Sequence, residues 1–241
     1  MYNEYNDYNQ TPPPYYGGRQ ESIEQVVSST MKMVYVKMTL GLLVTALTAW
    51  FAAISSTFTS FMSTHPWMMW VFIVAEFALV IGISSAIEKI SNAMATAMFY
   101  LFAFVNGLML FTIFYAYEPF TIAKTFMITA GTFAAMSVYG YTTSKDLTKV
   151  GSYLMMALFG LIIAMLVNLF MKSQMFDWII SIAGVAIFIG LTAWDTQAVK
   201  RMAAVTPAEY RGRLATIGAL NLYLDFINLF LYLLRIFGGR R

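Results

Sequence analysis

The 241-residue chain has no cysteine, a single histidine, and charges on only 11% of its residues. Without cysteine it can build neither a disulfide framework nor a thiolate metal site. The lone His65 stands in a loop beside Pro66, so a histidine-based metal centre is not expected either. A soluble domain carries about 25% charged residues, well above the fraction found here. We therefore expect a protein that is solvated largely by lipid.

Apolar side chains make up 59% of the residues, and they gather in seven runs. Each run approaches the ~20 residues that a helix needs to cross a bilayer. Backbone groups in lipid must pair within their own segment, so runs of this length predict helices, and the sequence lacks the alternation of a transmembrane β-barrel. The predicted fold is an all-α integral membrane protein with seven transmembrane helices. The expected spans are 33–57, 67–87, 94–117, 121–141, 150–170, 178–199 and 215–237.

The start of the chain has a different composition. Residues 1–20 read MYNEYNDYNQTPPPYYGGRQ, a tract rich in Tyr, Asn and Pro. Such a tract cannot bury enough apolar surface to offset its chain entropy. We expect residues 1–30 to form a disordered tail and residues 31–241 to form the seven-helix membrane domain. The alternative for residues 21–32, which are mixed polar and apolar, is a short interfacial helix.

The 15 Lys and Arg residues are spread unequally between the two sides of the predicted bundle. Those on the side of the N-terminus are Arg19, Lys32, Lys37, Lys89, Lys145, Lys149, Lys200, Arg201, Arg211 and Arg213. Those on the other side are Lys124, Lys172, Arg235, Arg240 and Arg241. Cytoplasmic loops carry the excess of basic residues. The N-terminus and its tail are therefore expected in the cytoplasm. The basic residues between the apolar runs determine topology, and no nucleic-acid partner is expected.

Two acidic residues, Asp195 and Asp225, lie inside the last two expected spans, with no basic residue at their depth. An ionisable side chain in hydrocarbon marks a functional site by default. Straight helices at 1.5 Å per residue place both in the cytoplasmic half, separated by ~9 Å in depth, which a small tilt removes. A surface ion pair of Asp195 with Lys200 or Arg201 is the alternative for this residue.

If the two carboxyl groups meet, they cannot both be ionised at low cost. The pair then shares a proton and titrates as a unit, and a hard cation, which prefers oxygen ligands, can replace that proton. The expected chemistry is a pH-gated cation path with Asp195 and Asp225 as sensor and transient cation ligands.

Other polar residues of the expected helices are candidates for the lining of this path. In the last span they recur every three or four residues, which places them on one face. They are Gly218, Asn221, Asp225, Asn228, Tyr232 and Arg235. The alternative for Asn221 and Asn228 is hydrogen bonding between helices. Glu76, in the second span, either joins the lining or is a protonated, hydrogen-bonded acid. Lys89, at the cytoplasmic end of that span, is a candidate gating partner, or it extends to the interface.

Three segments are similar to a known family. GLTAWDTQAVK and GALNLYLDFINLFLYLLRIFG resemble the last two helices of the transmembrane Bax inhibitor motif family, and FYLFAFVNGLMLFTIF resembles its third helix. The resemblance covers roughly residues 30–241. It implies six helices wrapped around a central seventh, and a calcium leak regulated by pH.

The resemblance also assigns roles to residues. Its di-aspartyl pH sensor on the cytoplasmic side matches Asp195 and Asp225. A basic residue at the cytoplasmic end of its second helix is linked to the closed state; Lys89 is the nearest match, with Glu88 beside it. The chain has no lysine-rich C-terminal tail, which suggests the bacterial branch and hence the inner membrane.

The leading hypothesis is a pH-sensitive cation leak channel, with calcium or another cation as permeant ion, no cofactor and no enzymatic activity. The alternative is a non-conducting regulatory membrane protein that binds a membrane protease or a stress factor, with the tail as its binding arm. Intramembrane aspartyl proteases carry Tyr-Asp and Gly-x-Gly-Asp, whereas Trp194 and Leu224 precede the acids here. A light-driven pump needs a lysine in the last helix, and none occurs between Thr216 and Phe237.

Overall fold

The computed structural model of the chain describes residues 22–86 and 89–238. Within these residues the chain is helical and contains no strand. Seven of its helical segments are long and apolar enough to cross a membrane. The predicted all-α class and the seven spans are therefore confirmed. Most of the expected tail, Glu88, and the basic pair Arg240 and Arg241 lie outside the described residues.

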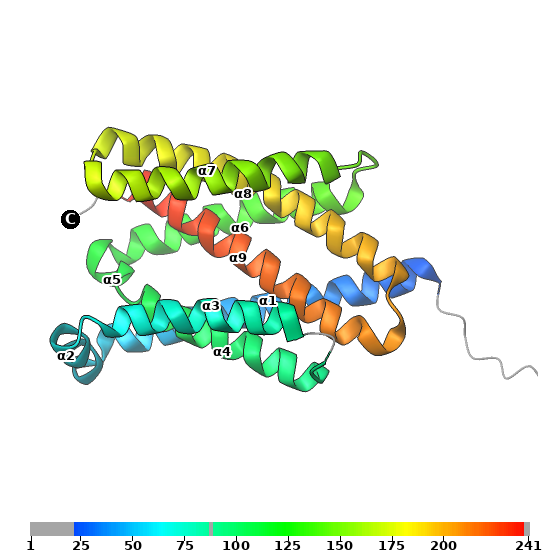
Figure 1. Ribbon diagram of the computed structural model, residues 1–241, viewed down its shortest axis with the longest axis horizontal. Helices are drawn as coiled ribbons and strands as arrows, with labels where there is room; N and C mark the ends of the chain where they lie inside the picture. The colour runs from blue at the N-terminus through cyan, green and yellow to red at the C-terminus, as the bar shows by residue number, and fades with distance from the viewer. Residues whose placement is uncertain (1–21, 87–88, 239–241) are drawn as a thin grey trace, which may run out of the picture.

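Figure 1 shows the order of the elements along the chain. They are α1 (Ile23–Ile54), α2 (Ser56–Thr64), α3 (Met68–Ala86), α4 (Asn92–Leu110), α5 (Ile113–Ala116), α6 (Pro119–Thr142), α7 (Thr148–Met171), α8 (Gln174–Val205), the short 3-10 helix η1 (Ala208–Tyr210) and α9 (Arg211–Phe237). The spans are α1, α3, α4 extended through α5, α6, α7, α8, and α9 preceded by η1. The short α2 connects the first two spans.

Helix α1 begins before the expected domain boundary at residue 31. The Ser22 hydroxyl accepts a hydrogen bond from the Gln25 backbone N–H, and the Gln25 side chain accepts one from the Ser22 N–H. This reciprocal capping box satisfies two backbone donors that a helix start otherwise leaves unpaired. Residues 23–30, which we expected in the tail, are therefore helical. The same helix ends at Ile54, where Ser55 caps α2, so the expected first span, 33–57, extended slightly too far.

The last helix, α9, crosses the middle of the bundle (Figure 1), and most of its residues are buried. Helices α1, α4, α6 and α8 pack directly against it. Helix α3 packs chiefly on α4, and α7 packs chiefly on α8. Four of the six other spans thus contact α9 directly, and α3 and α7 lie outside them.

The outer helices present apolar surfaces. Val74 on α3 is 66% exposed, and Phe170 on α7 is 85% exposed. Large apolar side chains in such number are unfavourable in water and suit contact with lipid. The membrane therefore covers the faces that the protein itself leaves open.

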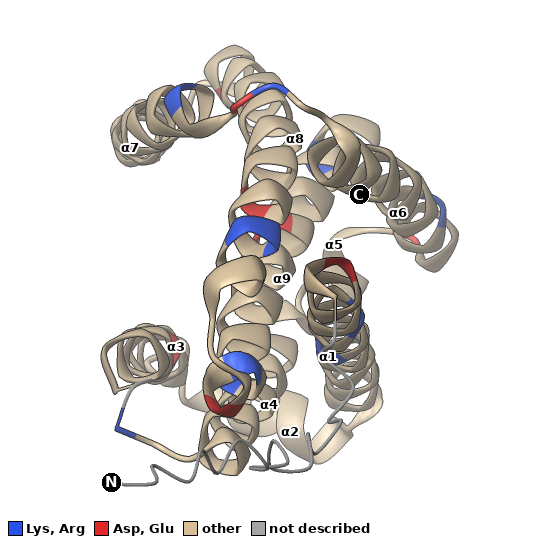
Figure 2. Cartoon of the chain, turned by 90° about the vertical axis from the view of Figure 1, so that its right-hand side faces the viewer, with Lys and Arg blue, Asp and Glu red and all other residues tan. Residues whose placement is uncertain are grey.

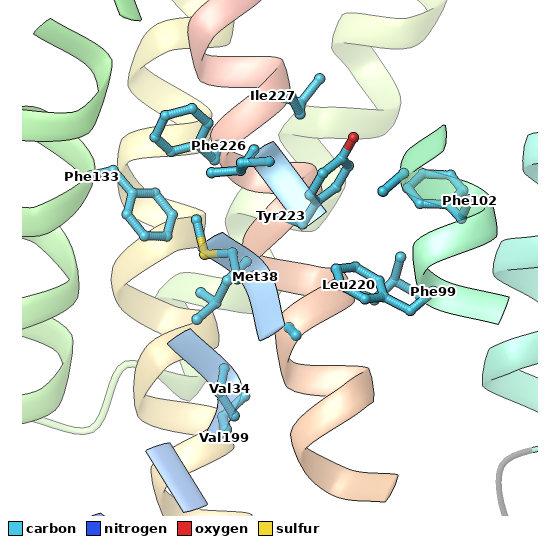
Figure 3. Close-up of a cluster of buried hydrophobic side chains, with 14 of the residues drawn as sticks. Val34, Met38, Phe99, Phe102, Phe133, Val199, Leu220, Tyr223, Phe226 and Ile227 are labelled. Carbon is cyan, nitrogen blue, oxygen red and sulfur yellow. The ribbon is translucent and has the colours of Figure 1, made fainter. Parts of the chain in front are cut away.

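Two close contacts hold α9 in place inside this frame. Phe99 and Phe102 of α4 meet the ring of Tyr223 edge-on, with ring centroids 5.8 and 5.6 Å away (Figure 3). A Cβ atom added to Gly218 would lie 3.0 Å from Val199 of α8 and 3.2 Å from Val34 of α1. The absence of a side chain at Gly218 therefore lets α1, α8 and α9 meet at one level, which fixes the depth of the residues that follow on α9.

Candidate functional site

The carboxyl groups of Asp195 on α8 and Asp225 on α9 lie close enough to interact directly with each other. The two helices are antiparallel and cross where Val199 meets Gly218. Asp195 precedes this crossing by one turn of α8, and Asp225 follows it by two turns of α9. Because the helices run in opposite directions, both acids lie on the same side of the crossing. Measured from the crossing, their positions differ by three residues, or about 4.5 Å along the helix axes.

Asp225 is 4% exposed, and Asp195 is half-buried. The Oδ2 atom of Asp225 is buried and has no hydrogen-bond donor within the described part of the chain. No Lys or Arg among these residues forms a salt bridge with either acid. The site therefore combines two adjacent carboxyl groups, an unsatisfied oxygen and no compensating cation. Such a pair can hold a proton between its oxygens or accept a cation from outside.

The basic residues that follow Asp195 on α8 point elsewhere. The Lys200 ammonium donates to the backbone carbonyl of Tyr141, 2.6 Å away. The Arg201 guanidinium donates to the carboxylate of Asp146, 2.5 Å away, and to the hydroxyl of Thr148. Hydrogen bonds from the hydroxyl and the backbone N–H of Thr148, together with Arg201, hold the pKa of Asp146 well below its usual range. The ion pair considered for Asp195 is thus formed by Asp146.

The polar stripe of α9 is only partly turned inward. Gly218, Asp225 and Tyr232 are buried, whereas Asn221 and Asn228 are half-buried. The Asn228 amide donates to the carbonyl of Leu224 on its own helix, 2.8 Å away. It therefore does not serve as the interhelical contact that we considered. Asn221 lies one turn before Asp225 and is the nearer of the two amides to the crossing with α8.

Glu76 belongs to a second polar centre, on the other side of α9. Its Oε1 accepts a 2.8 Å hydrogen bond from the amide of Asn106 on α4. The Asn106 oxygen accepts a 3.0 Å hydrogen bond from the hydroxyl of Tyr223. That hydroxyl lies 2.6 Å from Oγ1 of Thr45 on α1. The structure therefore joins Glu76 to α9 through Asn106 but does not bring it to the aspartate pair.

Sequence reasoning missed Asn106, Tyr223 and Thr45 as parts of a network. The available signal was an amide inside the third apolar run, since a polar side chain at that depth needs a partner. Nothing in the sequence shows that the partner lies on α3 and that the network continues to α9.

Several basic residues lie within helices instead of in the loops between spans, among them Lys32 and Lys37 of α1. Lys37 lies within α1, and its ammonium is close to acceptors on two other helices. These are Asn92 Oδ1 at 3.4 Å, Thr96 Oγ1 at 2.9 Å, the Gly212 carbonyl at 3.0 Å and Thr216 Oγ1 at 2.7 Å. Lys32 also lies within α1, but its side chain is exposed. Lys37 therefore ties α1 to α4 and α9 with neutral acceptors.

Lys89, the candidate gating partner, is exposed between α3 and α4, and its backbone N–H donates to the carbonyl of Ala86. It makes no ion pair with Asp195 or Asp225 in the described structure. The structure does not place Lys89 at the acids, and its gating role stays a prediction.

No group of three or more His, Cys, Asp or Glu side chains comes together within residues 22–86 and 89–238. Two carboxylates supply fewer oxygens than the ~6–8 ligands that Ca²⁺ takes. A cation at Asp195 and Asp225 would therefore need water or backbone carbonyls as further ligands.

The seven-span helical bundle defines a multi-pass membrane protein, in which Asp195 and Asp225 lie close together between the last two spans. The family model described as "Inhibitor of apoptosis-promoting Bax1" matches residues 27–241. The chain belongs to this Bax inhibitor family, as the resemblance in its last two helices predicts.

Relatives with similar sequences come from bacteria. The "Inner membrane protein YbhL" of Escherichia coli (strain K12) is 45% identical over 229 residues, which cover 92% of this chain and 98% of YbhL. An uncharacterized protein of Borreliella burgdorferi is 45% identical over 225 residues, 92% of this chain and 97% of the relative. One of Deinococcus radiodurans is 42% identical over 167 residues, 69% of this chain and 72% of the relative. These similarities support the bacterial branch of the family.

Proposed function

We propose that this protein is a pH-sensitive cation leak channel, with calcium as the main permeant ion, and that Asp195 and Asp225 are its proton sensor. The observation that carries the proposal is the contact between these two carboxyl groups inside the bundle. A carboxyl group at such a position is costly in lipid, and a single hydrogen bond between helices does not require two of them. Membership of the Bax inhibitor family supports a membrane channel or a membrane regulator.

The proposed mechanism follows from the charge on the pair. When one proton is shared, a short hydrogen bond joins α8 to α9. When that proton leaves, two negative charges remain side by side in a poorly solvated site, and they repel each other. The helices then separate at this level, or a cation enters between the oxygens and compensates the charge. Proton and cation therefore compete for the same oxygens.

We place the protein in the bacterial inner membrane with its N-terminus in the cytoplasm. The name of the Escherichia coli relative supports the membrane, and the excess of basic residues on the N-terminal side supports the orientation. In this orientation, Asp195 lies in the cytoplasmic half of α8, and Asp225 lies near the middle of α9. The proposal includes no cofactor and no catalytic step.

The experiment that tests this proposal is calcium flux into liposomes that contain the purified protein, measured over a series of pH values. The variants are Asp195→Asn and Asp225→Asn, which keep the shape of each side chain and remove its ionisation. Asp146→Asn is the matched control, because Asp146 is an exposed carboxylate outside the spans. We expect the flux to depend on pH in the wild type and in the control, and to lose this dependence in the other two variants.

Two results would change the proposal in different ways. If the wild type gives no flux above that of empty liposomes at any pH, the protein is not a channel. If there is flux but both amide variants keep the pH profile of the wild type, the channel remains and the aspartate pair is not its sensor.

The alternative function, a non-conducting regulator that binds a membrane protease or a stress factor, has one observation in its favour. Helices α1 and α8 each have 32 residues, whereas about 20 suffice to cross the bilayer. Their ends on the N-terminal side extend beyond the ends of α3 and α4 (Figure 1) and offer a surface to a partner. The absence of flux in the liposome experiment would favour this alternative.

A further inference from the structure

An apolar groove of about 680 Å³ runs between α1 and α6. Helices α1 and α6 lie apart on the same side of the bundle (Figure 2), and they do not belong to the closely packed pairs. Met38 of α1, Phe133 of α6 and Phe226 of α9 face one another across the groove (Figure 3). The ring centroids of Phe133 and Phe226 are 5.5 Å apart. The groove therefore has apolar walls and an aromatic floor supplied by the central helix.

The groove follows the membrane normal over about one leaflet. Its lining runs from Ser28 to Leu42 on α1 and from Phe126 to Tyr141 on α6. At 1.5 Å per residue these stretches are each about 21–23 Å long. One leaflet of the hydrocarbon core is about 15 Å thick, and the remainder reaches the headgroup region. The groove occupies the half of α6 that ends at Thr142, so it lies in the leaflet on the N-terminal side.

The end of the groove near Tyr141 continues into a polar cavity of about 830 Å³. Ser28 and Tyr141 line both, and Lys200 and Arg201 line the polar one. Arg201 is paired with Asp146. Lys200 donates to the Tyr141 carbonyl, and its ammonium lies 4.7 Å from the centre of the Tyr141 ring.

Lys200 is the cation at this cavity with capacity for an anionic ligand. No carboxylate among the described residues lies within salt-bridge distance of it. An ammonium group carries three N–H donors, and one of them is engaged by the Tyr141 carbonyl. Glu24 also lines the cavity, but it stands in the first turn of α1, where the helix N-terminus compensates a negative charge. Two donors of Lys200 remain for a ligand.

Between the polar end and the apolar part lies a hydroxyl group without a partner. Ser137 lines the groove one turn before Tyr141 and is 5% exposed. Its Oγ is buried and makes no hydrogen bond with any described residue. A buried polar group without a partner is unfavourable. A ligand with an acceptor at this level would remove that penalty.

We propose that the groove between α1 and α6 binds one phospholipid from the leaflet on the N-terminal side. One of its acyl chains lies along Met38, Phe133 and Phe226. The ester carbonyl of this chain accepts a hydrogen bond from the Ser137 hydroxyl, and the lipid phosphate binds the Lys200 ammonium. Cation, free hydroxyl and apolar wall follow one another along the groove in the order of phosphate, ester and chain in the lipid. This inference does not depend on ion conduction.

The test is native mass spectrometry of the detergent-purified protein during titration with phosphatidylglycerol. Ala134→Trp fills the groove, because Ala134 is exposed and lines it. Ala135→Trp is the matched control, because Ala135 is the next residue of α6, is also exposed and does not line the groove. We expect the wild type and the control to bind one lipid more tightly than all others, and Ala134→Trp to weaken this binding at least about tenfold.

A second variant tests the headgroup end. Lys200→Gln keeps a donor for the Tyr141 carbonyl and removes the charge. We expect the affinity for the tight lipid to fall about tenfold, as for the loss of a hydrogen bond to a charged group. Dioleoylglycerol, which has the chains and the ester groups but neither phosphate nor charge, should bind the wild type and Lys200→Gln with equal affinity.

Three outcomes would overturn the proposal. One is equal lipid binding by Ala134→Trp and Ala135→Trp, which would show that the groove is not the site. Another is equal phosphatidylglycerol affinity of the wild type and Lys200→Gln, which would remove the assigned phosphate contact. The third is a wild-type dimer that Ala134→Trp dissociates, which would make the groove an interface between two copies of the chain. Circular dichroism of each variant checks that the helices are intact.

Discussion

Tyr223 and Asp225 lie two residues apart on α9 and point to opposite sides of it. Successive residues of an α-helix turn by about 100°, so these two side chains diverge by about 200°. The hydroxyl of Tyr223 meets Asn106 of α4 and Thr45 of α1. The carboxyl group of Asp225 meets that of Asp195 on α8. The central helix therefore separates two buried polar centres, and substitutions can address each one alone.

The first prediction concerns the centre around Tyr223. Tyr223→Phe removes the hydroxyl and leaves the Asn106 oxygen and the Thr45 hydroxyl with fewer partners in a buried site. Leaving a buried polar group unsatisfied costs about 1–3 kcal/mol. We expect the free energy of unfolding in detergent to fall by an amount in this range, measured by denaturant or thermal unfolding.

Tyr232→Phe is the control for this prediction, because the Tyr232 hydroxyl has one hydrogen-bond partner among the described residues, the sulfur of Met165 at 3.3 Å. We expect it to cost less than Tyr223→Phe. The pH profile of calcium flux should be the same in Tyr223→Phe as in the wild type, because the aspartate pair lies on the other face. A flattened profile in Tyr223→Phe would show that this centre, rather than the aspartate pair, senses protons.

The second prediction concerns the lysine inside α1. Lys37→Met keeps an unbranched chain of similar length but removes the ammonium that joins α1 to Thr96 and Thr216. Hydrogen bonds to charged groups contribute about 1.5–3 kcal/mol to stability. Methionine packs better than lysine in apolar surroundings and offsets part of their loss. We therefore expect the free energy of unfolding to fall by about 1–2 kcal/mol. Lys32→Met, on an exposed position of the same helix, should change the stability by less than about 0.5 kcal/mol. Equal unfolding temperatures of the two variants would contradict this role of Lys37.

Sequence periodicity predicts which face of a helix is polar, but it does not predict how helices align along their axes. The apolar runs were sufficient to predict seven transmembrane spans. The position of Asp195 and Asp225 in neighbouring spans was sufficient to suggest that the two acids form a pair. The partners of Lys37 were not predictable, because Gly212 is 175 residues away in the chain. The start of α1 was missed for a local reason, since the capping box at Ser22 lies in a mixed polar segment.

The same limit applies to close approaches between helices. Gly140 of α6 packs directly against the backbone of Ala193 on α8, and a Cβ atom at Gly140 would overlap the Ala193 carbonyl. The sequence contains 15 glycines, and nothing in its pattern distinguishes this one. Only the packed structure shows that α6 depends on Gly140 to reach the helix that carries Asp195.

The third prediction follows from this contact. Gly140→Val forces α6 away from α8, and overpacking of this kind costs about 1–3 kcal/mol or more. We expect a corresponding fall in the free energy of unfolding. Gly131→Ala on the same helix is the control, because no atom lies within 4 Å of an added Cβ there, and alanine favours a helix over glycine by up to about 1 kcal/mol. The prediction is wrong if the two variants shift the unfolding temperature in the same direction.

The fourth prediction is a pH dependence at the loop between α6 and α7. Hydrogen bonds from Thr148 and the charge of Arg201 lower the pKa of Asp146 from 3.8, so the folded state binds this proton more weakly than the unfolded state. The stabilisation is therefore complete above the pKa of the unfolded state and is lost as the pH falls through the pKa of the folded state.

Asp146→Asn should lower the unfolding temperature slightly at pH 7, and the difference from the wild type should shrink as the pH decreases below about 4. Thr148→Val, which removes one donor to Asp146, should reduce the same difference in part. A difference that is constant from pH 7 to pH 3 would show that Asp146 stabilises the fold by other means than its charge.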